Sequence, residues 1–151
     1  MEIGIDKQGK FIGFKQQFKR RVKKMGKKII NTEKAPAAIG PYVQAIAANG
    51  TLYVSGQLGI NMETGEIPAG VADQARCSLK NMSAILSEAG IDYKSVIKTT
   101  IFLTDMGDFG TVNEVYGEFF QGENPARSCV AVKALPKDGK VEIECIADLN
   151  Q

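Results

Sequence analysis

The sequence predicts an α+β fold in which two helices cover one face of a single β-sheet. Short runs of apolar and β-branched residues have the length of strands, and two longer segments carry apolar residues at helical spacing. These segments follow the order strand, two strands, helix, strand, helix, two strands. A chain of 151 residues is the usual size of one domain, so a single core is expected.

The first strands are predicted near the start of this domain. The segment KIINT, residues 28–32, has the composition of a short strand. A loop rich in alanine and proline follows it. Residues 42–57 then predict two strands joined at Asn49 and Gly50, a dipeptide that is typical of a tight hairpin turn.

The two helices are predicted from their apolar stripes. The first runs from Val71 to Gly90, a glycine well placed to end it, and its stripe is Ala75, Leu79, Met82 and Leu86. The second has Asp108 as its candidate N-cap, and its stripe is Phe109, Val112, Tyr116 and Phe119 or Phe120.

Three further segments complete the predicted sheet. Residues 96–104, VIKTTIFLT, predict a buried strand, and residues 127–135 and 140–148 predict two more. The strand at 96–104 is apolar on both sides apart from Lys98 and its threonines. Because two helices cover only one face of a sheet, this pattern favours a second subunit on the other face.

Alternation along the strand at 127–135 separates its side chains into two sets. One set is Arg127, Cys129, Ala131 and Lys133, and the other is Ser128, Val130, Val132 and Ala134. Because the second set is the more apolar, we expect it to face the core. Glu142 alternates with apolar residues in the last strand. On the simplest interpretation both strands present a polar face to water, and Arg127 and Glu142 are surface charges. Alternatively, the guanidinium of Arg127 is placed to bind an anion.

Whether Arg127 and Glu142 share a site depends on the strand order. If their strands paired as a simple hairpin, the two residues would be separated by about eight residues along it, which is roughly 25 Å. A shared site therefore requires another strand order, or one of the two residues from a neighbouring chain.

The composition narrows the possible chemistry. The chain has no histidine, so acid–base catalysis near neutral pH would need another group. Its three cysteines, Cys77, Cys129 and Cys145, are widely spaced, which fits neither a disulfide framework nor a zinc site and suggests a reducing compartment. Without a histidine to activate it, Cys129 is better interpreted as a buried inert thiol. No run of about 18 apolar residues predicts a membrane span.

Residues 1–27 are predicted to be a basic extension before a domain at residues 28–151. Residues 1–28 hold ten lysines and arginines against two acidic residues, a net charge of +8, whereas the rest of the chain has a net charge of −6. Four apolar residues at helical spacing predict a basic amphipathic helix: Phe11, Phe14, Phe18 and Val22. We expect it to pack on the domain or to remain a solvated tail, in preference to a membrane, nucleic-acid or transit role.

Several segments, taken in order, resemble one family over residues 28–149. They include APAAIGPYVQA, VSGQLG, VIKTTIFLTDMGDF, PARSCVAV and LPKDGKVEIE. Together they resemble the RidA/YjgF family, also called the endoribonuclease L-PSP family. The resemblance implies a chorismate-mutase-like α+β fold, assembled as a homotrimer whose sheets line a central barrel and whose clefts lie between subunits.

The resemblance also implies an activity. Members of the branch most like this chain hydrolyse small 2-imino acids, such as 2-iminopropanoate and 2-iminobutanoate, to 2-keto acids and ammonia. They need no metal and no cofactor. A protein of this kind is expected in the cytoplasm or, alternatively, in a mitochondrion or related organelle.

Residue by residue, the resemblance suggests a site at a subunit cleft. Arg127 would clamp the substrate carboxylate through two parallel hydrogen bonds, and Glu142 would hold and polarise a water. Cys129 completes the expected catalytic set, through its nearby backbone and not through its thiol. The other residues expected to bind substrate are Tyr42, Ser55, Gly56 and Asn113, with Gly56 acting through its backbone.

Two other functions remain open from the sequence. An RNA-binding endoribonuclease or translation inhibitor is favoured by the basic extension, and disfavoured by the acidic domain and the missing histidine. A non-catalytic trimer that binds ligands or acts as a chaperone would use the same cleft for binding alone.

Overall fold

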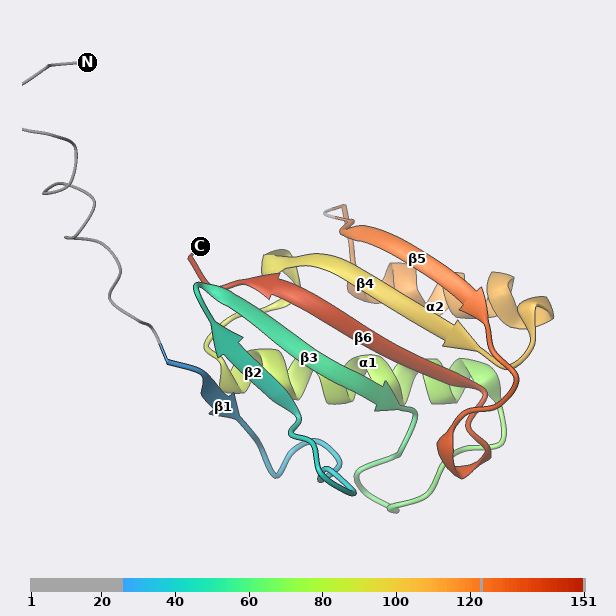
Figure 1. The fold of residues 1–151 in the computed structure, drawn as a ribbon. Helices are drawn as coiled ribbons and strands as arrows, with labels where there is room; N and C mark the ends of the chain where they lie inside the picture. The colour runs from blue at the N-terminus through green and yellow to red at the C-terminus, as the bar shows by residue number, and fades with distance from the viewer. Residues whose placement is uncertain (1–25, 123, 151) are drawn as a thin grey trace, which may run out of the picture.

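The computed structural model describes residues 26–122 and 124–150. Within them the chain forms one mixed six-stranded sheet in the order β1-β2-β3-β6-β4-β5, with two helices packed on one face (Figure 1). This architecture confirms the predicted α+β class. The basic helix predicted for the N-terminal extension lies outside the described residues.

The elements follow the predicted order along the chain. The strands are β1 (Lys28–Ile30), β2 (Ala45–Ala48), β3 (Thr51–Leu58), β4 (Val96–Leu103), β5 (Ala126–Ala131) and β6 (Val141–Asp148). The helices are α1 (Val71–Glu88) and α2 (Phe109–Phe119), and short 3-10 turns lie at Tyr93–Ser95, Met106–Asp108 and Pro136–Asp138. None of the helices in the described part of the chain is long and apolar enough to cross a membrane.

The predicted hairpin forms between β2 and β3. The two strands pair antiparallel, and Asn49 and Gly50 between them have φ values of 52° and 77°. A two-residue hairpin turn of type I′ requires positive φ at both central residues. The turn residues that predicted the hairpin therefore also adopt the conformation that explains their presence.

The helix ends agree with the prediction at α1 and differ in one detail at α2. Gly90 follows α1 with a φ of 81°, and the N–H of Ile91 donates to the carbonyl of Leu86, as in a Schellman motif. Asp108 occupies the N-cap position of α2, but its side chain makes no cap hydrogen bond. The aspartate that caps a turn here is Asp105, which begins the preceding 3-10 turn.

β4 lies between the last two strands of the chain. It pairs antiparallel with β6 and parallel with β5, and the parallel connection passes through α2. The strands predicted at 127–135 and 140–148 therefore do not pair with each other. The first is also shorter than predicted, because β5 ends at Ala131.

The core lies between the sheet and the helices. Alternate residues of β6 face α1 and are at most 2% exposed: Val141, Ile143, Cys145 and Ala147. From α1, the residues of the predicted stripe, together with Ile85, are fully buried. Burial of a leucine, isoleucine or methionine stabilises the fold by about 1.5–3 kcal/mol per side chain, so this layer holds the sheet on which the site is built.

The two faces of β5 are the reverse of those predicted. Cys129 packs against the core and Arg127 lies over aromatic rings of α2, whereas Val130 is 43% exposed. The reason is the register with β4, because Arg127 and Cys129 stand opposite Thr99 and Ile101, which are buried under the helices. The apolar residues of β5 therefore do not identify its core side, because the sheet face away from the helices is itself partly apolar.

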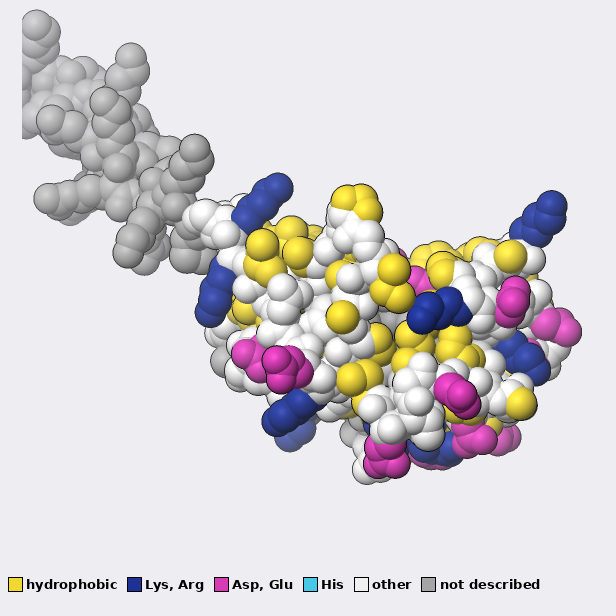
Figure 2. Space-filling view, turned by 90° about the horizontal axis from the view of Figure 1, so that it is seen from below, with side chains coloured by type: hydrophobic (Ala, Val, Ile, Leu, Met, Phe, Trp, Pro, Cys, Tyr) yellow, Lys and Arg dark blue, Asp and Glu magenta, His cyan; other side chains and the backbone are white. Residues whose placement is uncertain are grey.

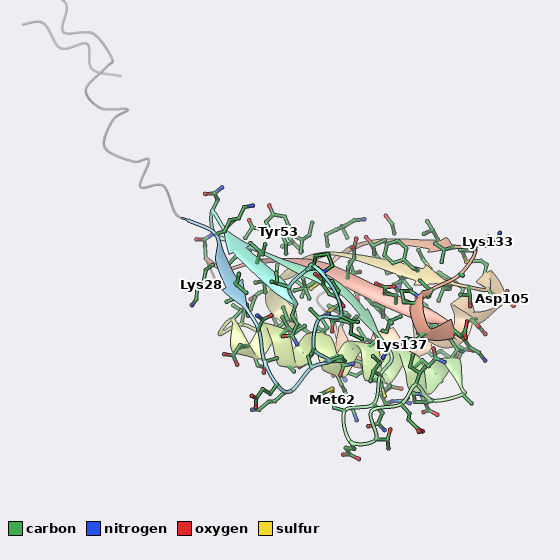
Figure 3. All side chains as sticks on the ribbon, turned by 60° about the horizontal axis from the view of Figure 1, so that its bottom comes forward. Lys28, Tyr53, Met62, Asp105, Lys133 and Lys137 are labelled. Atoms are coloured by element: carbon green, nitrogen blue, oxygen red, sulfur yellow. The ribbon has the colours of Figure 1, made fainter. Side chains whose placement is uncertain are left out.

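That open face of the sheet carries a row of large side chains. Ile29, Ile46, Tyr53 and Ile146 stand opposite one another across β1, β2, β3 and β6. Ile29 is 57% and Tyr53 is 51% exposed, and Figure 3 shows Tyr53 on the side of the sheet away from the helices. Nothing in the described part of the chain covers this row. A second subunit on this face stays a prediction, and this row of side chains is the surface that it would cover.

A buried glutamine ties the loop before β2 to the sheet. Gln44 is 3% exposed, and its Oε1 accepts a hydrogen bond from the Thr32 N–H at 2.7 Å. Its Nε2 donates to the carbonyls of Thr32, Ala35 and Pro36 at 3.0, 3.2 and 2.9 Å. One side chain thus satisfies backbone groups along the whole start of this loop. Residues of the same loop also line a cavity.

Gln44→Met is expected to lower the free energy of unfolding by roughly 2–4 kcal/mol, because methionine fills a similar volume but leaves several buried backbone groups unpaired. Urea unfolding at one fixed protein concentration measures the change. Gln121→Met is the matched control, since Gln121 is exposed and its amide donates to the Glu118 carbonyl at the surface. Its change should stay within about 0.5 kcal/mol, and equal losses in both variants would contradict the role of Gln44.

Candidate active site

Arg127 lines a cavity between α2 and the start of β5. The cavity has a volume of about 480 Å³. Its lining residues are Asn113, Tyr116, Gly117, Asn124, Pro125 and Arg127. The structure therefore brings together Arg127 and Asn113, two of the residues expected to hold substrate.

The guanidinium of Arg127 lies on two aromatic rings of α2. Its Cζ is 4.8 Å from the centroid of the Tyr116 ring and 5.7 Å from that of the Phe109 ring. Tyr116 is held in turn by a 2.8 Å hydrogen bond between its hydroxyl and Thr99 Oγ1. A cation over an aromatic face gains on the order of 0.5–2 kcal/mol, and a stacked guanidinium keeps its N–H edge for an anion. The ion pairs among the described residues belong to Arg76, so Arg127 has no carboxylate partner there.

Cys129 lies on the helix side of the same strand. Burial raises the pKa of its thiol, and the charge of Arg127 offsets that rise only in part. A thiol with a raised pKa is protonated near neutral pH and is a poor nucleophile. This environment favours the inert thiol expected from the sequence and leaves only the backbone of Cys129 for a role in the site.

The other predicted residues line a second cavity at the loop end of the sheet. Its volume is about 580 Å³, and it includes Tyr42, Ser55, Gly56 and Glu142. The loop before β2, the end of β3 and the turn before β6 form its walls, and Figure 3 shows Lys137 in that turn. Figure 2 views the molecule from this end and shows hydrophobic side chains gathered around single basic and acidic ones.

A β-bulge in β3 shapes this second cavity. The pairing of β3 with β6 shifts between Val54 and Gln57, so that Ser55 and Gly56 together stand opposite Glu144 alone. The amide of Gln57, which is 5% exposed, donates to the carbonyls of Ser55 and Gly56 at 3.0 and 3.3 Å. A buried side chain therefore holds the bulge in one conformation.

Glu142 lies over this bulge on the open face of the sheet. Burial raises the pKa of its carboxyl group, and the neighbouring charge of Glu144 raises it further. Among the described residues no hydrogen bond to a side chain or backbone group occupies its carboxylate oxygens. A carboxylate with a raised pKa and available oxygens is suited to accept a proton from a water molecule.

The two hydroxyl groups of this cavity offer opposite chemistry to a ligand. Ser55 Oγ donates to the carbonyl of Val43 at 2.7 Å, so only its lone pairs remain available. The Tyr42 hydroxyl accepts a hydrogen bond from the Ile39 N–H at 3.2 Å, so its own O–H remains a donor. Tyr42 is also 50% exposed, which leaves it within reach of a bound molecule.

The two halves of the predicted site do not meet within one chain. Along β4, Arg127 is level with Thr99 and Glu142 is level with Phe102, a difference of three residues, or about 10 Å. Their strands are separated by β4, which adds about 10 Å across the sheet. Arg127 also faces the helices, while Glu142 faces the open side. Although β5 and β6 do not pair as a hairpin, the observed strand order still separates Arg127 from Glu142.

Sequence reasoning missed the residues that support each half. The sequence pattern places Phe109 and Tyr116 in the apolar stripe of α2. Two aromatic residues seven positions apart also share a helix face on which an arginine can stack, and that signal was available. Gln57 had no signal of its own, because a glutamine within a strand does not reveal that it bonds the backbone beside it.

The fold and its two cavities, one with Arg127 and one with Glu142, define a small α+β protein with charged cavities on both sides of one sheet. A family model described as Endoribonuclease L-PSP matches residues 32–149, and the chain belongs to that family. This match confirms the resemblance found in the sequence.

Relatives extend over the same part of the chain. The 2-iminobutanoate/2-iminopropanoate deaminase of Mus musculus is 52% identical over 122 residues, which cover 80% of this chain and 90% of that protein. Reactive Intermediate Deaminase A, chloroplastic, of Arabidopsis thaliana is 54% identical over 124 residues, which cover 82% of this chain and 66% of that protein. The crystal structure of Escherichia coli TdcF with bound serine superposes with a TM-score of 0.77 at 52% identity, covering 80% of this chain and 98% of that one.

The pKa of Glu142 is expected to lie above the ordinary value of a glutamate and to fall when Glu144 is changed to glutamine. The fall should be partial, because burial is the larger cause of the shift. Carboxyl ¹³C NMR titration measures it, with Glu88→Gln at the exposed end of α1 as the control that should change nothing. Since the folded pKa is raised, the stability contributed by Glu142 is full below the unfolded pKa and is lost as pH rises through the folded pKa. An ordinary pKa for Glu142 would contradict the effect expected from burial and from Glu144.

Proposed function

We propose that the protein hydrolyses small 2-imino acids, such as 2-iminopropanoate and 2-iminobutanoate, to 2-keto acids and ammonia. The observation that carries this proposal is the guanidinium of Arg127, held on two rings at a cavity and without an acidic partner among the described residues. The relatives named as deaminases support it, and so does the serine bound to TdcF, a small molecule with a carboxylate beside a nitrogen-bearing carbon.

Arg127 binds the substrate carboxylate and fixes the position of the imine carbon. Glu142 accepts a proton from a water as the water oxygen bonds to the carbon of the protonated imine, and the C=N electron pair moves to nitrogen. Glu142 then returns that proton to the nitrogen. The C–N bond breaks, the hydroxyl oxygen becomes the keto oxygen, and its proton leaves with the ammonia as ammonium. No covalent enzyme intermediate and no histidine are needed.

The complete site lies between two chains of a homotrimer whose open sheet faces line a central barrel. Arg127 of one chain faces Glu142 of the next. The backbone near Cys129 and Gly56 hydrogen-bonds the imine or the water, and the cleft is lined by Tyr42, Ser55 and Asn113. Two observations support this arrangement: the half-sites are apart within one chain, and the open face carries an uncovered apolar row in the described part of the chain.

The activity is tested by generating 2-iminobutanoate in situ with an amino-acid dehydratase and following its loss. Wild type is expected to speed the loss, and Arg127→Ala to lower kcat/KM by about 100-fold or more, because the carboxylate is no longer held. Arg127→Lys should recover little, since an ammonium cannot make the parallel pair of bonds.

Arg76→Ala is the matched control, because Arg76 pairs with Glu118 at the surface, and its activity should stay within about twofold of wild type. No acceleration by wild type would remove the deaminase proposal and leave the RNA-directed or binding-only functions. Full activity of Arg127→Ala would contradict the proposed binding of the substrate carboxylate by Arg127.

A mixture of two inactive variants tests the site between chains. Arg127→Ala and Glu142→Gln chains are unfolded together in equal amounts and refolded. If each site takes Arg127 from one chain and Glu142 from another, about one quarter of the sites combine both intact halves and activity returns to about that fraction. If both residues act from the same chain, the mixture stays inactive, which would contradict the cleft between chains.

A further inference from the structure

We propose that Gly56 is a positioning residue whose missing side chain provides the seat for the carboxylate of Glu142. The role goes beyond a backbone hydrogen bond from Gly56 to the ligand, since it concerns the space above the glycine. It rests on the proposed function, in which Glu142 moves the proton of the attacking water.

The geometry of the seat is defined by what a side chain at position 56 would meet. A Cβ built on Gly56 would lie 1.8 Å from Oε1 of Glu142, 2.7 Å from its Cδ and 3.0 Å from its Cγ. The carboxylate therefore occupies the space that any other residue would fill. Even alanine would force either the backbone of β3 or the side chain of Glu142 to move.

The backbone of β3 is the part that resists movement. The carbonyls of the two bulge residues, Ser55 and Gly56, accept hydrogen bonds from the buried amide of Gln57. The Ser55 N–H donates to the carbonyl of Gln44 at 2.9 Å, and Ser78 Oγ of α1 donates to the carbonyl of Gln57 at 2.7 Å. Because β3 is held from β2 and from α1, the clash is relieved at the free end of the glutamate.

Displacement of Glu142 changes its surroundings without changing the core. The cavity around it also contains Glu144, which repels the carboxylate, and Lys137 in the turn before β6. A carboxylate pushed off the bulge moves away from the sheet toward solvent. It then loses the burial that raises its pKa and no longer holds water at the fixed position that hydrolysis needs.

Two other glycines show that this seat differs from an ordinary packing requirement. At Gly59 a Cβ would meet backbone atoms of Gln74 at 2.4 to 2.7 Å, so a side chain there would disturb the contact between β3 and α1. At Gly110, near the start of α2, nothing lies within 4 Å of the added Cβ. Gly56 lies between these two cases, because a side chain added there would meet the side chain of Glu142 and not the backbone of a packed element.

The inference is tested first with Gly56→Ala and Gly110→Ala. Gly56→Ala is expected to fold with a urea midpoint close to that of wild type and to lower kcat by about 10- to 100-fold. Its KM should change little, because Arg127 is untouched. Gly110→Ala should leave activity unchanged. A Gly56→Ala enzyme with wild-type kcat would overturn the proposal.

A shorter carboxylate separates the seat from any other role of the glycine. Glu142→Asp withdraws the carboxylate from the bulge and lowers activity by itself. In that background Gly56→Ala should cost little more, because the space above position 56 has already been vacated, so the two effects are not additive. If Gly56→Ala lowers activity by the same factor in both backgrounds, the glycine acts through its own backbone, and the proposed seat for Glu142 is contradicted.

Titration of Glu142 by carboxyl ¹³C NMR gives a readout that does not depend on the reaction. Gly56→Ala is expected to lower the pKa of Glu142 toward that of an exposed glutamate, while Gly110→Ala leaves it unchanged. If wild type shows no deaminase activity but this pKa falls, the proposed function fails and the seat stands. If the enzyme is active and the pKa does not fall, the seat fails and the proposed function stands.

Discussion

The position of β4 between β5 and β6 is the constraint on which the rest of the structure depends. Because β4 pairs parallel with β5 and antiparallel with β6, it sets the register of Arg127 on one side and of Glu142 on the other. The same pairing turns Arg127 toward α2 and Glu142 toward the open face. One chain therefore holds Arg127 and Glu142 in two separate cavities. Under the proposed function, a neighbouring chain brings the two residues together.

The two half-sites hold their charges by opposite means. Arg127 rests on the rings of Phe109 and Tyr116, which stabilise a cation without neutralising it and keep its N–H edge available. Glu142 lies above the bulge of β3, in partial burial and beside Glu144, so its charged form is disfavoured and its pKa rises. A carboxylate that is costly for stability and unpaired within the described residues is typical of a functional position. The buried layer between β6 and α1 offsets that cost.

Local signals predicted most of the fold, and the resemblance to the family suggested the residues of the site. Asn49-Gly50 and Gly90 predicted their turns correctly because positive φ is a local requirement that few residues meet. Every residue of the predicted site except Cys129 lines one of the two cavities. The faces of β5 were predicted wrongly, because alternation divides a strand into two faces but does not say which one meets the helices. Val130 is apolar and still lies on the open side.

The sequence by itself determined the α+β class, the order of elements, the turn chemistry, the missing histidine and the family. These depend on composition and on periodicity over a few residues, which a chain carries before it folds. The tertiary structure decided the strand order, the aromatic support of Arg127 and the contact between Glu142 and Gly56. The crossover from β4 through α2 to β5 places Arg127 on the rings of α2, and the pairing of β3 with β6 places Glu142 over Gly56. These contacts form only after the strands have paired in this order.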